Sequence, residues 1–175
     1  MTPEIRFCRR CGSPVQADNE HKYTCAQGHV LFVNPAPCVG VFLQQSDGQL
    51  VLSVRGVEPH KGQLDIIGGF VDGDETLEQA LEREIDEELG LSADEYSQPI
   101  YLTSAIGHYP YGGETLVVLS TIFFAELHAD ARPVARDDVG RLAYFEIDAV
   151  DPRDFHDDDI RSGFAALKKH LATRS

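Results

Sequence analysis

Apolar residues fall into short runs separated by turn signals over most of the chain. Cys38 to Leu43 is an apolar run of strand length, Ser46-Asp47-Gly48 is a turn signal, and Leu50 to Val54 is the next run. Two such runs joined by a short polar turn predict a β-hairpin. Later runs predict three more strands, over residues 100–106, 116–125 and 143–147.

One helix is marked at both of its ends. Thr76 followed by Gln79 is a capping box, and Gly90 stops the helix. Between them, apolar residues recur at helical spacing, at Leu77, Ala80, Leu81, Ile85 and Leu89. A second amphipathic pattern predicts a closing helix over residues 162–171. Strands mixed with helices predict an α/β or α+β sandwich, in which helices pack on a mixed sheet.

The first 34 residues have a different composition. Apolar periodicity is weak there, and three cysteines lie among polar residues until Asn34-Pro35-Ala36-Pro37 marks a change. We therefore expect two parts, a small module over residues 1–34 and a main domain over residues 35–175.

The cysteines of the small module have the spacing of zinc ligands. Cys8-x2-Cys11 is followed, after 13 residues, by Cys25-x3-His29. Short knuckles with Cys and His ligands are typical of structural zinc, and four protein ligands leave no open position for catalysis. His21 is a weaker choice for the fourth ligand. Cys38 lies in an apolar run and is interpreted as a buried thiol.

The helix over residues 77–89 carries an unusual arrangement of carboxylates. On a helical wheel, Glu84 and Glu88 fall beside the apolar face, with Glu87 alongside, whereas Glu82 and Asp86 fall on the far side. Like charges one turn apart destabilise a helix unless a cation lies among them. Oxygen ligands favour Mg²⁺ or Mn²⁺. The alternative is an exposed, charge-rich helix with ion pairs to Arg83.

The stretch from Gly69 to Leu91 resembles the Nudix box, G-x5-E-x7-R-E-U-x-E-E-x-G-U with U aliphatic. Every fixed position matches, namely Gly69, Glu75, Arg83, Glu84, Ile85, Glu87, Glu88, Gly90 and Leu91. The proline that usually precedes the paired glycines is Ile67 here. The resemblance covers residues 36 to about 150.

The resemblance implies a fold, a reaction and a set of roles. The fold is an α/β/α sandwich with a mixed sheet. The reaction is Mg²⁺-dependent hydrolysis of a nucleoside diphosphate linked to another moiety, such as ADP-ribose, a dinucleotide or a sugar nucleotide. Metal ligands would be Glu84, Glu87 and Glu88, helped by a backbone carbonyl near Gly68, and Arg83 would brace the loop by pairing with Glu75.

The general base varies within this family, between a glutamate of the box and a residue of a later loop. Asp137 and Asp138 precede the strand expected at residues 143–147, where relatives often carry that acidic residue. We take Asp138 as the candidate general base. The alternative for Asp138 is a solvated loop carboxylate.

The cysteine module resembles the zinc ribbon of the NADH pyrophosphatase branch of the family. In that alignment the fourth cysteine falls on Gly28, so either His29 takes its place or the zinc site has decayed. The branch also carries S-Q-P-W-P-F-P-x-S, of which the segment from Ser104 to Gly112 keeps the Ser and one Pro. This difference argues against NADH specificity. Tyr109 and Tyr111, interpreted as loop residues, are candidates for stacking on a base or ribose.

The net charge of the chain indicates which class of ligand it binds. Fifteen Lys and Arg against 29 Asp and Glu give a formal net charge of −14. Binding along a nucleic-acid backbone usually needs a basic stripe, so nucleic acid is not the expected partner. An anionic small-molecule substrate would instead need a bound cation.

Other sequence features concern location and partners. The chain lacks an apolar run long enough to span a membrane and lacks a secretory h-region at its start, so we expect a cytoplasmic protein without a membrane partner. A homodimer is a further expectation, because dimers are common among such enzymes. The competing hypothesis is a catalytically silent, nucleotide-sensing module that uses the ribbon for protein contacts. The complete set of box glutamates argues against it.

Overall fold

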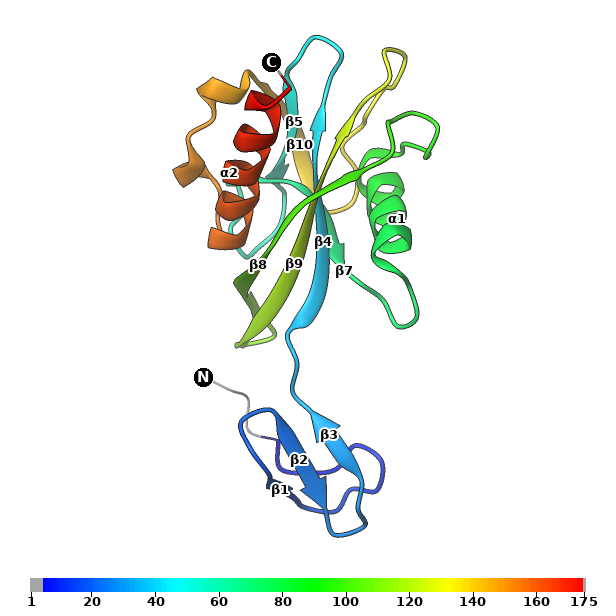
Figure 1. Cartoon of the computed structure of the whole chain (residues 1–175), viewed down its shortest axis with the longest axis vertical. Coiled ribbons are helices and arrows are strands. Elements are labelled where there is room, and N and C mark those ends of the chain that lie inside the picture. Colours follow the sequence, from blue (N-terminus) through cyan, green and yellow to red (C-terminus); the bar gives the residue numbers. More distant parts are fainter. Residues whose placement is uncertain (1–4, 175) are drawn as a thin grey trace. The chain divides into compact units, whose positions relative to one another are not determined.

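The computed structural model of this protein describes residues 5–174. The chain forms two compact units, one up to Pro35 and one from Ala36 onward, and Figure 1 shows both along the chain.

The unit up to Pro35 is a small antiparallel sheet with loops. Its strands, in the order β1-β2-β3, are Val15–Ala17, Lys22–Cys25 and Val30–Phe32. Its buried core consists of Cys8, Cys25 and Leu31. So few buried apolar groups rarely hold a fold without a metal or a disulfide.

The second unit is built on a mixed, seven-stranded sheet. Strands β10-β5-β4-β9-β8 lie side by side, while β6 pairs with β5 and β7 pairs with β4. The β4–β9 pair is parallel and the other pairs are antiparallel. The strands are β4 (Ala36–Gln44), β5 (Leu50–Arg55), β6 (Leu64–Asp65), β7 (Ile67–Phe70), β8 (Ile100–Tyr111), β9 (Glu114–Glu126) and β10 (Val139–Phe145).

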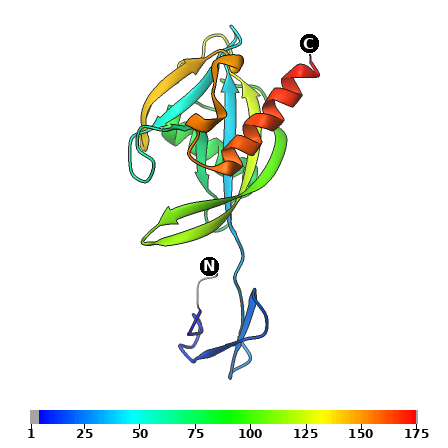
Figure 2. The same ribbon diagram turned by 90° about the vertical axis from the view of Figure 1, so that its left-hand side faces the viewer.

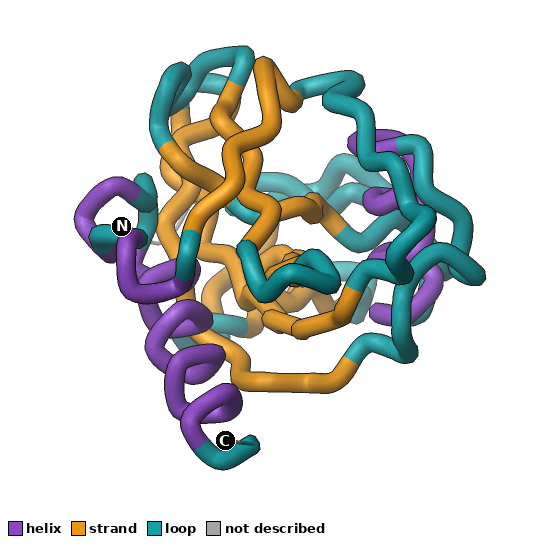
Figure 3. The backbone as a smooth tube through the Cα atoms, turned by 90° about the horizontal axis from the view of Figure 1, so that it is seen from above, coloured by secondary structure: helices purple, strands orange, loops and turns teal. Residues whose placement is uncertain are grey.

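One helix covers each face of this sheet (Figures 2 and 3). Helix α1 (Leu77–Leu89) packs into a cluster of 16 buried residues with Val41 and Leu43 of β4. Helix α2 (Asp158–Ala172) packs into a second cluster on Phe42 of the same strand. Successive side chains of a strand point to opposite faces, so β4 is apolar throughout because both faces are covered. The expected α/β/α sandwich with a mixed sheet is confirmed.

Short helical turns complete the second unit. Two 3₁₀ turns, η1 (Ile147–Ala149) and η2 (Pro152–Asp154), connect β10 to α2. None of the helices among residues 5–174 is long and apolar enough to cross a membrane.

The local signals in the sequence are confirmed by the backbone. Leu43 pairs with Val51 across the expected hairpin. Thr76 makes both hydrogen bonds of the capping box with Gln79. Gly90 ends α1 in the left-handed conformation, with φ of 67°, which glycine adopts without a steric penalty.

Three elements differ most from the sequence predictions. Strand β8 continues to Tyr111 instead of ending at Ile106, because it pairs with β9 along its whole length and turns only at Gly112-Gly113. Tyr109 and Tyr111 are therefore strand residues, and their interpretation as loop residues was wrong. Strand β10 begins at Val139, and α2 begins at Asp158 because Asp157 caps it.

Candidate functional site

A cavity of about 370 Å³ lies in the second unit. Its lining comes from strands β4 to β9, helix α1, the loop before β10, and the start of α2. Acidic side chains dominate this lining, with Asp65, Asp72, Glu84, Glu87, Glu88, Asp137, Asp138, Asp157 and Asp159. The cavity therefore repels a phosphate unless cations are present.

Helix α1 presents three of these carboxylates to the cavity at graded depths. Glu88 is buried, the Glu84 side chain is 13% exposed, and the Glu87 side chain is 51% exposed. Glu82 and Asp86, on the far side of the helix, are exposed. The wheel thus predicted the orientation of the helix correctly, since Leu81 and Ile85 anchor it in the core.

Two glycines let the helix approach β7 closely. A Cβ on Gly68 would lie 2.1 Å from the Val39 carbonyl oxygen, and the φ of Gly68 is +148°. A Cβ on Gly69 would lie 2.4 Å from Glu84 Oε1. The Gly68 N–H donates to Glu88 Oε2 at 3.0 Å. Only glycine fits at position 68, because the atom that a Cβ would meet there is a backbone oxygen, whereas a Cβ on Gly69 would push the Glu84 carboxylate aside.

Arg83 ties the carboxylate helix to the preceding loop. Its Nε and Nη2 donate to the two oxygens of Glu75 at 2.8 and 3.0 Å. Its remaining N–H groups donate to Glu84, Glu87 and the Phe70 carbonyl oxygen. A guanidinium has five N–H donors, so Arg83 has none left for a ligand.

Burial perturbs the acidity of the carboxylates. It raises the pKa of Glu88 to about 8, with a further rise from the negative charge of Glu84, and the Gly68 hydrogen bond opposes this. Burial also raises the pKa of Glu84, against the effect of Arg83. Buried carboxylates that repel one another suit a hard divalent cation, which favours oxygen ligands and offsets their charge. The donor set therefore fits Mg²⁺ or Mn²⁺.

Asp137 and Asp138 both line the cavity from the loop before β10. Their side chains are exposed, and Asp137 has a φ of 48°. The Asp138 carbonyl oxygen accepts from the Gly56 N–H at 2.9 Å, which fixes the loop against the end of β5. The candidate base thus lies in the same cavity as the glutamates.

An aromatic surface borders the cavity. Phe70 meets Tyr109 and Tyr111 edge to face, with ring centroids 6.0 and 6.4 Å apart. Tyr109 and Tyr111 are two residues apart on β8, and their rings lie 6.4 Å apart on one face of the sheet. Rings of this kind can stack on a nucleobase.

Sequence reasoning missed a polar network in the cavity wall. Asp65 Oδ2 accepts from Arg55 Nη1 at 2.7 Å and lies 2.9 Å from His156 Nε2. Asp159, which is buried, accepts a hydrogen bond from Ser120. Asp65 and His156 are 91 residues apart in the chain. Such distant partners leave no local pattern from which to predict the network.

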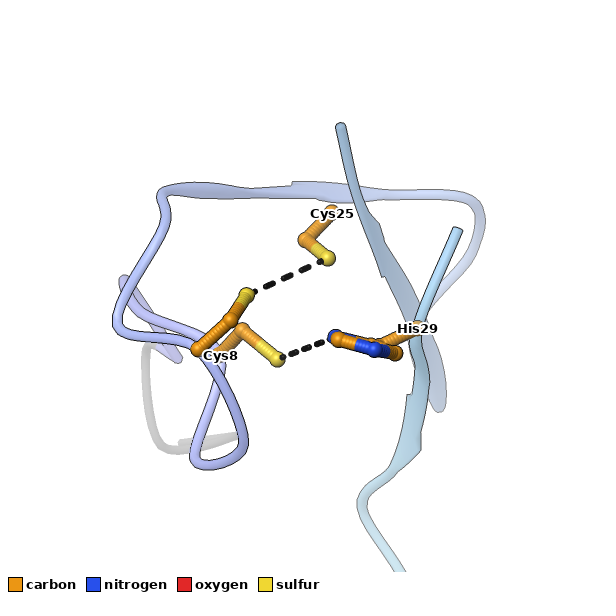
Figure 4. Close-up of side chains that lie close together, drawn as sticks. Cys8, Cys25 and His29 are labelled. Atoms are coloured by element: carbon orange, nitrogen blue, oxygen red, sulfur yellow. Dashed lines mark hydrogen bonds between the residues drawn. The ribbon is translucent and has the colours of Figure 1, made fainter. Parts of the chain in front are cut away.

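The cysteine module gathers the predicted zinc ligands. The ligand atoms of Cys8, Cys11, Cys25 and His29 lie within 4.8 Å of one another. Cys8 Sγ is 3.6 Å from His29 Nδ1, and Cys11 Sγ is 3.8 Å from Cys25 Sγ. Figure 4 shows Cys8, Cys25 and His29 converging on one point. Tetrahedral zinc with Zn–S of about 2.3 Å separates its ligand atoms by roughly 3.5–3.8 Å, so the cluster fits zinc.

Other potential ligands lie outside this cluster. His21 is exposed and is not part of it. Cys38 is half-buried, lines the cavity of the second unit, and has a pKa raised to about 12 by burial.

Within the cluster, hydrogen bonds from Ser13 lower the pKa of Cys11 to about 6. The lower pKa favours the thiolate form, which binds metal.

The chain is similar in sequence to a known protein family and to several curated proteins. The model of the NUDIX domain matches residues 34–166. "NAD-capped RNA hydrolase NudC" of Salmonella heidelberg is 32% identical over 69% of this chain and 44% of its own length. "NAD(P)H pyrophosphatase NUDT13, mitochondrial" of Mus musculus is 26% identical over 83% of this chain and 40% of its own length. The chain thus spans about half the length of the curated relatives it matches.

Solved structures share the fold. A NUDIX hydrolase from Nitrosomonas europaea superposes with a TM-score of 0.68 at 21% identity, over 97% of this chain and 92% of the other. The NUDIX domain of Shewanella oneidensis NrtR, complexed with ADP ribose, superposes with a TM-score of 0.61 at 17% identity, over 80% of this chain and 90% of the other. At this identity the likeness concerns the fold alone.

Proposed function

The chain belongs to the NUDIX domain family, and from that premise we propose that it is a pyrophosphohydrolase. Its substrate would be a nucleoside diphosphate linked to another moiety, and the products a nucleoside monophosphate and a second phosphate ester. The observation that carries this proposal is the set of Glu84, Glu87 and Glu88, held at graded depth against Gly68-Gly69 in one acidic cavity.

The chain's own residues have distinct tasks in this reaction. Mg²⁺ or Mn²⁺ held by the three glutamates and the Gly68 carbonyl would neutralise phosphate charge and acidify the attacking water. Arg83 fixes Glu84 and Glu87 by hydrogen bonds and is itself held by Glu75. Asp138 accepts the proton of the water as general base, a task typically worth 10²–10⁴-fold in rate.

The substrate class rests on the cavity and on the relatives. The aromatic surface of Phe70, Tyr109 and Tyr111 supports a nucleoside part, through stacking on Tyr109 and Tyr111. The names of the curated relatives concern NAD(P)H and NAD-capped RNA. A net charge of −14 favours a small nucleotide over an RNA chain.

The cysteine module is part of the same proposal as a structural zinc site. Cys8, Cys11, Cys25 and His29 would hold one Zn²⁺ with no position left open, so the metal stabilises the module and takes no part in hydrolysis. A cytoplasmic location and a homodimer stay predictions from the sequence.

The proposal is tested by release of phosphomonoester from a substrate panel with Mg²⁺ or Mn²⁺ and a phosphatase couple. The panel holds NADH, NAD⁺, ADP-ribose, diadenosine polyphosphates, sugar nucleotides and nucleoside triphosphates. We expect turnover of one class, reduced by roughly 10²–10³-fold in Glu88→Gln. Glu82→Gln, on the exposed side of the same helix, is the matched control and should keep full activity.

Two further results bear on the proposal. Asp138→Asn should lower kcat by at least about a hundredfold, and Asp137→Asn should not, if Asp138 is the base. Nucleotide binding without turnover of any panel member would contradict the enzyme and favour a nucleotide-sensing module.

A further inference from the structure

The cavity contains two arginines with different hydrogen-bonding capacity. Arg83 uses all five of its N–H donors on protein oxygens. Arg55 uses three, on the Pro59 carbonyl oxygen at 2.8 Å, Asp65 at 2.7 Å and the Tyr109 hydroxyl at 3.0 Å. Two donors of Arg55 therefore remain for a ligand.

The position of Arg55 is fixed by neighbours that are themselves hydrogen-bonded or stacked. Its partner Asp65 also accepts from the Ile66 N–H at 2.8 Å and contacts His156 Nε2 at 2.9 Å. The His156 ring is in turn stacked on His60, with ring centroids 4.8 Å apart. The side chains of Arg55 and Asp65 are each 13% exposed. A guanidinium held this firmly loses little entropy when it binds.

The surroundings of Arg55 indicate which ligand it would bind. Its Cζ lies 5.8 Å from the centre of the Tyr109 ring, on the aromatic surface proposed to stack on the nucleoside. Among the described residues that line the cavity, Arg55 is the arginine with donors to spare, and nine carboxylates line the same cavity. An oxyanion next to the stacked nucleoside is a phosphoryl group, and paired N–H donors match phosphate oxygens.

We propose that Arg55 binds a phosphoryl group of the nucleotide substrate, as a binding residue outside the glutamate helix. This inference rests on the proposed function, because it assigns a contact for the same substrate. It also gives a role to the network of Asp65, His156 and Tyr109, which then orients Arg55 toward the substrate.

The alternative is that Arg55 only joins β5 to β6 through its ion pair with Asp65. The two roles differ in one measurable respect. A joining role lowers the melting temperature of a variant and leaves ligand affinity unchanged, whereas a binding role lowers affinity for a phosphorylated ligand.

The test is calorimetric titration of the whole chain with α,β-methylene-ADP, a diphosphate that resists hydrolysis, in the presence of Mg²⁺. We expect Arg55→Gln to raise Kd by roughly tenfold to a hundredfold, as for the loss of charged hydrogen bonds. Arg55→Lys keeps the charge and a partner for Asp65 but loses the planar fork, so its Kd should lie in between. Arg141→Gln, an exposed arginine on neighbouring β10, is the matched control and should bind like the wild type.

The outcomes separate this inference from the proposed function. A Kd within twofold of wild type for both Arg55 variants overturns the inference, and so does a wild-type protein that does not bind the probe. If Arg55→Gln does not fold, Arg55→Lys decides alone. A wild type that binds the probe in an Arg55-dependent way but hydrolyses no panel member would overturn the function and leave the inference standing.

Discussion

The two groups of side chains proposed to bind metal are supported by hydrophobic cores of very different size. The Cys8, Cys11, Cys25 and His29 cluster lies in a unit with three buried apolar residues. Glu84 and Glu88 lie on a helix anchored in a cluster of 16 buried residues. The first group offers soft sulfur and nitrogen ligand atoms within 4.8 Å of one another, and the second offers oxygens that face a cavity.

This contrast indicates what each metal does. Without a metal, the small unit has too little apolar burial to offset its chain entropy, so its metal would be part of the fold. The larger unit has a complete core on both faces of its sheet. The larger unit can therefore tolerate the destabilising repulsion between its carboxylates. A metal bound by them would not be needed for folding and could take part in catalysis.

The largest effect is expected from removing the soft site. Cys25→Ser should abolish zinc binding and unfold residues 5–35, because zinc contributes about 10–16 kcal/mol to such modules at pH 7. The unit from Ala36 should keep its protection in hydrogen-exchange mass spectrometry. Cys38→Ser is the control outside the cluster. Full protection of residues 5–35 in Cys25→Ser would contradict a structural role for the metal.

The next effect is steric and concerns the glycines that support the oxygen site. Gly68→Ala should destabilise the larger unit by about 3 kcal/mol or more, because its Cβ would meet a backbone oxygen and its φ disfavours any other residue. Gly73→Ala has open space around it and should cost far less. Urea unfolding of both variants measures the difference. Equal stability would show that the helix does not depend on this close approach.

A smaller effect is expected from the brace between loop and helix. Glu75→Gln removes the charge that holds Arg83, which frees Arg83 to reorient Glu84 and Glu87. We expect kcat to fall about tenfold, as for the loss of a residue that orients metal ligands. Glu78→Gln, exposed in the first turn of the same helix, should be unaffected. Steady-state kinetics at saturating Mg²⁺ measures this loss of kcat, because a variant that had lost only affinity for Mg²⁺ would regain full activity there.

The smallest effect concerns the aromatic surface. Tyr111 is 63% exposed, so Tyr111→Ala should leave the fold intact and raise KM by roughly threefold to tenfold through lost stacking. Tyr144→Ala, 44% exposed on β10, is the comparison on the opposite edge of the sheet. A KM equal to that of Tyr144→Ala would remove Tyr111 from the substrate site.

Local patterns predicted those parts of the molecule that are fixed by neighbours in sequence. The capping box of Thr76 and the burial of Glu88 follow from spacings of three and four residues. The spacing of the first knuckle likewise predicted that Cys8 and Cys11 lie in one cluster. These features depend on backbone geometry over a few residues, which the sequence records directly.

Contacts between distant segments were not predictable in the same way. The Arg55–Asp65–His156 network joins three segments that only the folded sheet brings together. The continuation of β8 to Tyr111 depends on pairing with β9, and its exposed, mixed residues carry no strand pattern. Tertiary pairing overrides local preference in such strands.

We propose that one chain holds a structural soft-metal site and a separate, catalytic oxygen-ligand site. The most direct measurement is turnover of the best panel substrate after mild chelation, with zinc content determined on the same sample. We predict no turnover until Mg²⁺ is added, full recovery with Mg²⁺, and one zinc per chain throughout. Turnover that follows the zinc content, or that needs no added divalent cation, would contradict two separate sites with these roles.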